Sequence, residues 1–297
     1  MENRKPVLGF IGLGVMGNPI SSRFLAAGYP VIGYDVSPSA MDSFSAAGGQ
    51  GAESALEVAN SASIVFTSLP SIAVFRQVIA GAGGLIDGSA VKVVVDLSTV
   101  GGTATMEVAG ALQGRNIELV DAPVSGGAAG ARAGTLAVMI AGSTEAVERV
   151  MPILQILGKT FRVGDQAGHG QLMKLLNNML SSTALAVTAE AYVAGTRAGL
   201  DPQTMMDVFN AGSGRNNATS DKFPKHVLPG TFDFGFPISS VCKDIGLAIE
   251  ECQAFGVPMW LGGQARQIWQ AAATQGGATD DLTSIVNIME RWSSDRE

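Results

Sequence analysis

The chain has 297 residues, of which 46% are hydrophobic and 15% are charged, and its formal net charge is −7. This length suits two domains or one large one, and so few charges favour a large buried core. No basic run accompanies the negative charge, which argues against a nucleic-acid partner. No apolar run is long enough to span a bilayer and none near the N-terminus fits a signal peptide, so we expect a cytoplasmic protein without a membrane partner.

The cysteines and histidines argue against a disulfide framework and against a structural metal site. Cys242 and Cys252 are ten residues apart in an expected helix, too far apart for a bridge within a regular helix. There are only two histidines, and no Cys-x-x-Cys pair occurs. We therefore expect no metal, and cysteine usage compatible with a reducing compartment.

The first half of the chain alternates between strand-like and helix-like segments. Strands are expected at Val7–Ile11, Val31–Tyr34, Ile64–Ser68, Val91–Asp96, Ile117–Asp121, Leu136–Ala141 and Thr160–Val163. Helices are expected at Asn18–Ala27, Ser39–Ala47, Glu53–Ala59, Ile72–Ala80, Gly102–Gln113 and Thr144–Leu157. Short strands joined by helices predict an α/β domain with a doubly wound, mostly parallel sheet.

The pattern changes after Gly164, and every later segment is helical in character. The expected helices are His169–Ala198, Pro202–Asn210, Ser239–Phe255, Met259–Gln275 and Thr283–Arg291. Prolines fall between these segments, where helices start or stop. We therefore predict an α/β domain over residues 1–164 and an all-α domain over residues 165–297.

A glycine turn near the N-terminus is the most informative motif. It lies between the first expected strand and the first expected helix, and consists of Gly12, Leu13, Gly14, Val15, Met16 and Gly17. The first glycine permits a sharp turn, the second lets a pyrophosphate approach the backbone, and the third allows close packing of helix on strand. The helix N-terminus then offers free N–H groups to phosphates. The spacing predicts a dinucleotide site, and the alternative is a purely structural turn.

Asp35 ends the second expected strand, where a carboxylate can accept hydrogen bonds from the adenosine ribose. It would repel a 2′-phosphate, and Val36, Ser37 and Pro38 supply no cation to hold one. The sequence therefore favours NAD over NADP. The alternative is a solvated acid at a strand end.

Polar turns follow three neighbouring strands, at the sheet edge where α/β proteins bind ligands. They are Thr67–Pro70, Asp96–Thr99 and Asp121–Gly127. In the last of these, Ser125, Gly126 and Gly127 offer a hydroxyl and backbone N–H groups suited to a carboxylate. An ordinary polar turn is the alternative for each one taken alone.

Four polar residues in the helical half are further candidates. Lys174 and Asn178 are four residues apart and share one face of the long expected helix. A lysine reaching solvent and an asparagine bonded to a loop would give the same spacing. Arg215 can fork onto a carboxylate. Lys243 lies in an apolar helix, where it can approach a cofactor or pair with a surface carboxylate.

Together these motifs resemble the β-hydroxyacid dehydrogenase family, which includes 3-hydroxyisobutyrate dehydrogenases and tartronate semialdehyde reductases. The resemblance runs nearly end to end, through Gly9–Gly17, Leu69–Pro70, Asp96–Thr99, Asp121–Gly127, Gly170–Asn178, Ser213–Arg215 and Lys243–Asp244. It implies a Rossmann-like domain followed by a helical domain, and a homodimer or homotetramer. It implies NAD-dependent hydride transfer to or from a small hydroxyacid or its semialdehyde.

The resemblance also implies residue roles. Lys174 matches the catalytic lysine, while Ser125, Gly126, Gly127 and Asn178 match the substrate-carboxylate site. Matches to residues that line the cofactor are Leu69, Pro70, Thr99 and Lys243. The chain departs from the family at Asn18-Pro19, which a helix start tolerates, and at Gly101-Gly102, where many relatives have a proline soon after the threonine.

The Gly101-Gly102 departure leaves the substrate open: threonate, a hydroxymethyl dicarboxylate, a sugar acid or an imine are alternatives. Arg215 and Asn216 are candidates for binding a polar distal group of such a substrate. A nucleotide-binding module without chemistry is the rival from another class, and the presence of both Lys174 and Asn178 argues against it.

Overall fold

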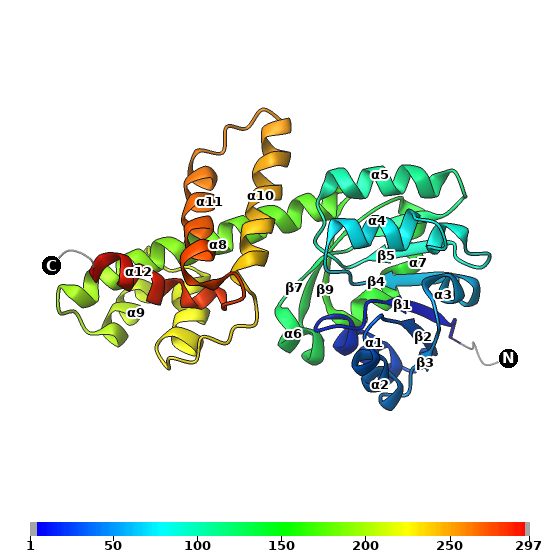
Figure 1. Cartoon of the computed structure of the whole chain (residues 1–297), viewed down its shortest axis with the longest axis horizontal. Coiled ribbons are helices and arrows are strands. Elements are labelled where there is room, and N and C mark those ends of the chain that lie inside the picture. Colours follow the sequence, from blue (N-terminus) through cyan, green and yellow to red (C-terminus); the bar gives the residue numbers. More distant parts are fainter. Residues whose placement is uncertain (1–4, 295–297) are drawn as a thin grey trace. The chain divides into compact units, whose positions relative to one another are not determined.

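The computed structural model describes residues 5–294. They form two compact units, one reaching to Lys174 and the other beginning at Leu175 (Figure 1). The predicted domain boundary after residue 164 lies ten residues earlier (174 against 164). The first turn of the long helix thus belongs to the first unit.

The first unit is built on one sheet that contains nine strands of the described chain. Their order is β3-β2-β1-β4-β5-β6-β8-β7, and β9 pairs with β8. The strands are β1 (Leu8–Ile11), β2 (Val31–Tyr34), β3 (Gln50–Gly51), β4 (Ile64–Thr67), β5 (Val93–Asp96), β6 (Glu118–Asp121), β7 (Val124–Ser125), β8 (Leu136–Ala141) and β9 (Gly158–Gly164). All neighbours from β3 to β6 are parallel, whereas β8 runs antiparallel to β6 and β7. The predicted mostly parallel, doubly wound sheet is confirmed.

Helices cover both faces of this sheet because side chains of successive strand residues point to opposite faces. Leu8 and Phe10 enter one core, and Ile11 enters the other. The first face carries α1 (Gly17–Ala26), α2 (Pro38–Ala46), α6 (Gly127–Ala133) and α7 (Thr144–Leu154). The second carries α3 (Ala55–Ser61), α4 (Ile72–Ala80) and α5 (Gly102–Gln113), and the short turns η1 (Leu85–Asp87) and η2 (Gln155–Leu157) complete the unit.

Four short elements of the first unit were not predicted from the sequence. They are β3, β7, α6 and η1. The two strands have two residues each, too few to show an alternating pattern, and α6 reads GAAGARA, which has no large apolar side chain to mark a helical face. The consequence is that Ser125, expected in a turn, ends a strand, and Gly127 begins a helix.

The second unit is helical, as predicted. It contains α8 (His169–Arg197) from Leu175 onward, α9 (Pro202–Ala211), η3 (Ala218–Val227), α10 (Ile238–Ala254), α11 (Trp260–Ala272), η4 (Ala273–Gly277), η5 (Leu282–Ser284) and α12 (Ile285–Ser294). Its core surrounds the fully buried Trp269. No helix was predicted over η3, which is a π-helical segment with a proline inside it. None of the described helices combines the length and apolar character needed to cross a membrane.

Candidate active site

The glycine turn has the shape that a dinucleotide requires. Gly12 adopts φ +88°, and a Cβ atom there would overlap the Ser68 carbonyl oxygen. A Cβ at Gly17 would overlap the Gly12 carbonyl, so this glycine lets α1 pack closely against the turn. By contrast, a Cβ at Gly14 would meet nothing within 4 Å. The backbone at Gly14 is therefore open to a phosphate group at the N-terminus of α1.

Asp35 is fixed beside this turn rather than free at a strand end. Its Oδ2 accepts a hydrogen bond from the Leu13 backbone N–H at 2.6 Å, and its Oδ1 accepts one from the Ser37 N–H at 2.8 Å. Each carboxylate oxygen has a second lone pair, so both retain capacity for ribose hydroxyls. Val36, the next residue, is 86% exposed and carries no charge. These residues fit an NAD nucleotide at this edge.

The predicted cofactor-lining loops are joined by buried hydrogen bonds. Asp96, at the end of β5, accepts from Thr67 Oγ1 at 2.7 Å and from Ser98 Oγ at 2.6 Å. The Ser98 hydroxyl in turn accepts from the Leu69 N–H at 2.8 Å. The structure thereby holds Leu69 next to Gly12 and ties the Leu69-Pro70 loop to the one that carries the half-buried Thr99.

The segment predicted to bind a substrate carboxylate joins β7 to α6. Ser125 is half-buried and pairs with Ala137 of β8. Gly126 and Gly127 follow with φ +133° and +62°, values that side chains rarely permit. A Cβ at Gly127 would meet nothing within 4 Å. Open backbone therefore lies directly after the Ser125 hydroxyl.

Asp121 and Gln171 fix the first turn of α8 to the sheet edge. The Asp121 carboxylate accepts from the Gly168 N–H at 3.0 Å and the Gln171 N–H at 2.9 Å, and so caps the helix from a neighbouring strand. The Gln171 side chain accepts from the N–H groups of Val100 and Gly101 at 3.0 and 3.2 Å, and it donates to the Ser98 carbonyl at 2.9 Å. Lys174, on the next turn, is only 7% exposed.

Asp121 and Gln171 belong to motifs noted in the sequence, but neither was predicted as a site residue. Burial raises the pKa of Asp121 to about 7, against the opposing effect of the two backbone N–H donors. Because the capping contact joins residues that are 47 positions apart, no local signal in the sequence identifies this role of Asp121.

In the second unit, Asn178 and Lys243 converge on one carboxylate. Asn178 Nδ2 donates to Asp244 Oδ2 at 2.7 Å, and Lys243 Nζ lies 3.2 Å from Asp244 Oδ1. Asp244 is 2% exposed, whereas the Lys243 side chain is 34% exposed. The structure therefore brings these two predicted residues together through a partner that was not among the predicted site residues.

Arg215 and Asn216 form no side-chain hydrogen bond or ion pair, within the described chain, with Asn178, Lys243 or Asp244. Arg215 is exposed, and no side-chain hydrogen bond or ion pair joins it to another residue of the described chain. The Asn216 side chain accepts from the N–H groups of Ala218 and Thr219 at 2.7 and 3.2 Å. It thus caps the start of η3, which is a structural role.

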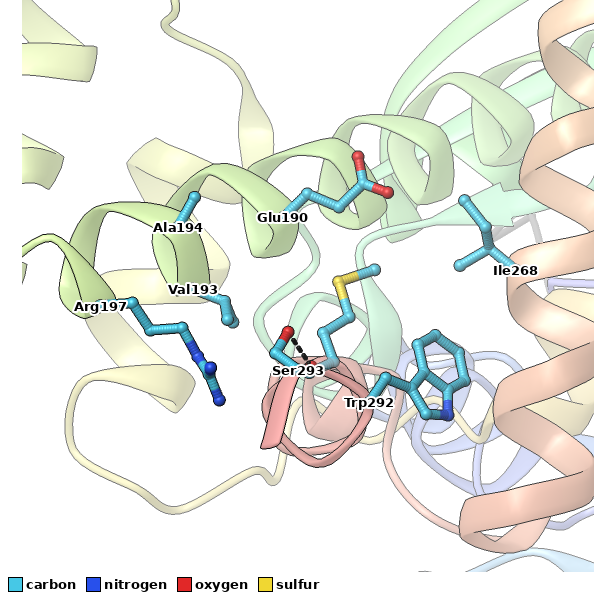
Figure 2. A pocket seen from close by; sticks show the side chains of 8 residues that line it. Glu190, Val193, Ala194, Arg197, Ile268, Trp292 and Ser293 are labelled. Carbon is cyan, nitrogen blue, oxygen red and sulfur yellow. Dashed lines mark hydrogen bonds between the residues drawn. The ribbon is translucent and has the colours of Figure 1, made fainter. Parts of the chain in front are cut away.

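Two cavities of the described residues lie away from all of these groups. One, of about 430 Å³, is lined by α8, α11 and α12, including Glu190 and Trp292 (Figure 2). The other, of about 320 Å³, lies between α4 and α5. Neither is lined by a predicted site residue.

Comparison with known proteins follows the same division of the chain. Residues 7–165 match the NAD binding domain of 6-phosphogluconate dehydrogenase, and residues 168–289 match the family described as NAD-binding of NADP-dependent 3-hydroxyisobutyrate dehydrogenase. The chain is 36% identical over 288 residues to 2-(hydroxymethyl)glutarate dehydrogenase of Eubacterium barkeri, covering 96% of this chain and 95% of the relative. The chain belongs to the β-hydroxyacid dehydrogenase family.

Other relatives agree in sequence and in structure. The 3-hydroxyisobutyrate dehydrogenase of Pseudomonas aeruginosa is 36% identical over 274 residues, which cover 90% of this chain and 92% of that protein. The 3-hydroxyisobutyrate dehydrogenase of Mycobacterium tuberculosis, solved with L-serine, superposes with a TM-score of 0.88 at 31% identity, over 96% of this chain and 99% of that one. This β-hydroxyacid dehydrogenase is thus an NAD-dependent oxidoreductase that acts on a small hydroxyacid, as the sequence predicted.

Proposed function

We propose that this β-hydroxyacid dehydrogenase transfers a hydride between NAD(H) and a small 3-hydroxyacid or its semialdehyde, with Lys174 as general acid and base. One observation carries the proposal. Lys174 is buried one turn after Gln171, on a helix start that Asp121 and Gln171 tie to the ligand-binding edge of the sheet. A lysine whose helix is fixed in this way can act repeatedly at one substrate oxygen.

The residues divide the work between proton transfer and binding. The nicotinamide, when bound, accepts or supplies the hydride. Lys174 Nζ takes the proton of the substrate hydroxyl in oxidation and returns it to the carbonyl oxygen in reduction. The Ser125 hydroxyl and the N–H groups of Gly126 and Gly127 bind the substrate carboxylate, with Asn178 as a further donor. Arg215 is a candidate contact for a polar group at the distal end of the substrate. The nucleotide is held by Gly12, Leu13, Gly14, Val15, Met16, Gly17, Asp35, Leu69, Pro70, Thr99 and Lys243.

A second substrate class is supported by a specific relative. The similar enzyme of Eubacterium barkeri is named for a hydroxymethyl dicarboxylate, in which the reacting –CH₂OH end is the same as in 3-hydroxyisobutyrate. Lys174 and the Ser125–Gly127 segment would treat both reacting ends alike. The choice between a monocarboxylate and a dicarboxylate therefore depends on residues farther along the substrate.

We also propose a homodimer or homotetramer in the cytoplasm. Leu180 and Val187 of α8 are 67% and 55% exposed and are seven residues apart, so they share one helical face that a second copy would cover. Cys242 and Cys252 are both free thiols, which suits a reducing compartment.

A substrate panel tests the proposal directly. The purified protein is given NADH or NADPH with tartronate, methylmalonate or succinate semialdehyde, and NAD or NADP with 3-hydroxyisobutyrate, glycerate, threonate or 2-(hydroxymethyl)glutarate. The absorbance of NADH reports turnover. We expect turnover with at least one hydroxyacid and its semialdehyde. Binding of NADH without turnover of any of these compounds would instead favour the nucleotide-binding module.

A further inference from the structure

Lys222 of η3 carries a buried ammonium group whose hydrogen-bond and aromatic partners are neutral. It is 3% exposed, and its Nζ donates to Ser181 Oγ of α8 at 3.0 Å and lies 5.1 Å from the centre of the Phe234 ring. No carboxylate of the described chain lies within ion-pair distance of it. Its neighbour Asp221 pairs instead with Lys225, at 2.5 Å. Lys222 thus lacks a close counter-ion inside the second unit.

A buried cation without a counter-ion is costly, because it has lost water and gained only dipoles in return. Burial lowers the pKa of Lys222 to about 8, although the nearby charge of Asp221 acts in the opposite direction. An anion bound at Nζ would restore the missing charge. The Lys222 side chain is therefore suited to bind an anionic ligand.

The position of Ser181 places this cation along the candidate site. Asn178 and Ser181 are three residues apart on α8, and Lys174 precedes Ser181 by seven, so the three share one helical face. At 1.5 Å per residue, Ser181 lies about 4.5 Å beyond Asn178 along the helix axis. Asn217 Nδ2 also donates to Ser181 Oγ, at 2.7 Å. With two donors on its oxygen, the hydroxyl keeps its own hydrogen for an acceptor.

This distance fits a substrate with two carboxylates. In 2-(hydroxymethyl)glutarate, three carbons separate the two carboxyl carbons, a span of roughly 5 Å at C–C lengths near 1.5 Å. One carboxylate bound near Asn178 would put the other near Ser181. In 3-hydroxyisobutyrate a methyl group replaces the carboxyethyl arm, so no carboxylate of that substrate would reach Lys222.

We propose that Lys222, with Ser181 and Asn217, binds the distal carboxylate of the substrate, so that the enzyme prefers hydroxymethyl dicarboxylates to hydroxy monocarboxylates. This inference rests on the proposed function, because it assumes that the reacting end of the substrate is placed by Lys174 and Asn178. It assigns the distal contact to a buried lysine rather than to Arg215 and Asn216.

The test compares two substrates in three proteins. The kcat and KM for NAD-dependent oxidation of 2-(hydroxymethyl)glutarate and 3-hydroxyisobutyrate are measured for the wild type, Lys222→Met and Lys225→Met. Lys225 is the matched control, because it is an exposed lysine of the same segment. The wild type should prefer the dicarboxylate. Lys222→Met should lower kcat/KM for the dicarboxylate about 10- to 100-fold, mainly by raising KM, and should not change kcat/KM for the monocarboxylate. Lys225→Met should not change kcat/KM for either substrate.

A binding experiment separates this inference from the proposed function. 2-Methylglutarate has both carboxylates but no hydroxyl, and its affinity for the NAD-saturated protein is measured by calorimetry beside that of isobutyrate. Tighter binding of 2-methylglutarate, lost in Lys222→Met, would support the anion site even if no substrate turned over. Equal affinities for 2-methylglutarate and isobutyrate would overturn the proposed anion site. So would a wild-type preference for the monocarboxylate. An equal loss of kcat/KM for both substrates, with a lowered Tm, in Lys222→Met would overturn it as well.

Discussion

Asp35 connects the glycine turn to the start of α2 through its carboxylate. It accepts from Leu13 on one side and from Ser37 on the other, so its negative charge is held where an adenosine ribose would lie. A 2′-phosphate at this position would face a fixed carboxylate and the neutral, exposed Val36. The preference for NAD over NADP thus depends on the Asp35 carboxylate, which two backbone N–H groups hold in place.

Replacing that charge should change the cofactor preference. In Asp35→Ser combined with Val36→Arg, the ratio of kcat/KM with NADP to that with NAD should rise at least about tenfold, because the repulsion is removed and an arginine is added. Val36→Arg alone is the control and should produce a smaller rise. A wild-type protein that already prefers NADP by more than about tenfold would contradict this account of Asp35.

At the level of elements, the first turn of α8 depends on a carboxylate from β6. Burial raises the pKa of Asp121 above its usual value, to about 7. The folded state therefore binds this proton more tightly than the unfolded state, and the stability that it contributes is present below about pH 4 and is lost as the pH rises through about 7. The full effect is up to about 4 kcal/mol.

Asp121→Asn should remove this contribution, because an amide does not titrate. Urea unfolding from about pH 4.5 to about pH 7.5 should show a fall in the free energy of unfolding of the wild type that is reduced in the variant. The exposed Asp42→Asn serves as the control and should retain the wild-type dependence. An equal pH dependence of the free energy of unfolding in wild type and Asp121→Asn would show that Asp121 is not the source of this pH-dependent stability.

The elements differ in how far the sequence could predict them. The long apolar periodicities of α8 and α10 and the apolar runs of β1 and β5 identified these elements to within a few residues. The shape of the glycine turn was also predictable, because it depends on local backbone geometry. Capping by Asp121 and the burial of Lys222 depend on contacts between segments far apart in sequence, and no local pattern encodes them.

At the scale of the whole molecule, each unit has its own hydrophobic core, so the α/β and helical parts can be predicted separately from composition and periodicity. Oligomerisation has no comparable local signal. Exposed apolar side chains on α8 mark a surface suited to a second copy, but they do not encode the number of copies. The dimer or tetramer therefore rests on the family resemblance and on this one face.

The oligomeric state can be measured directly. One chain has a mass of 30.5 kDa, so light scattering coupled to size exclusion should give about two or four times this value. Leu180→Asp should shift the distribution toward smaller species, whereas Leu200→Asp, which changes an exposed leucine outside the α8 face, should not. A wild-type protein that stays monomeric at high concentration would contradict the proposal.

Transfer of the substrate proton by Lys174 is tested most directly by one comparison. For Lys174→Ala, kcat with the best substrate and the Kd of NADH by fluorescence are measured side by side, with the exposed Lys92→Ala as control. We expect kcat to fall at least about 100-fold while the affinity for NADH stays unchanged. Unchanged turnover with a loss of NADH affinity would contradict it.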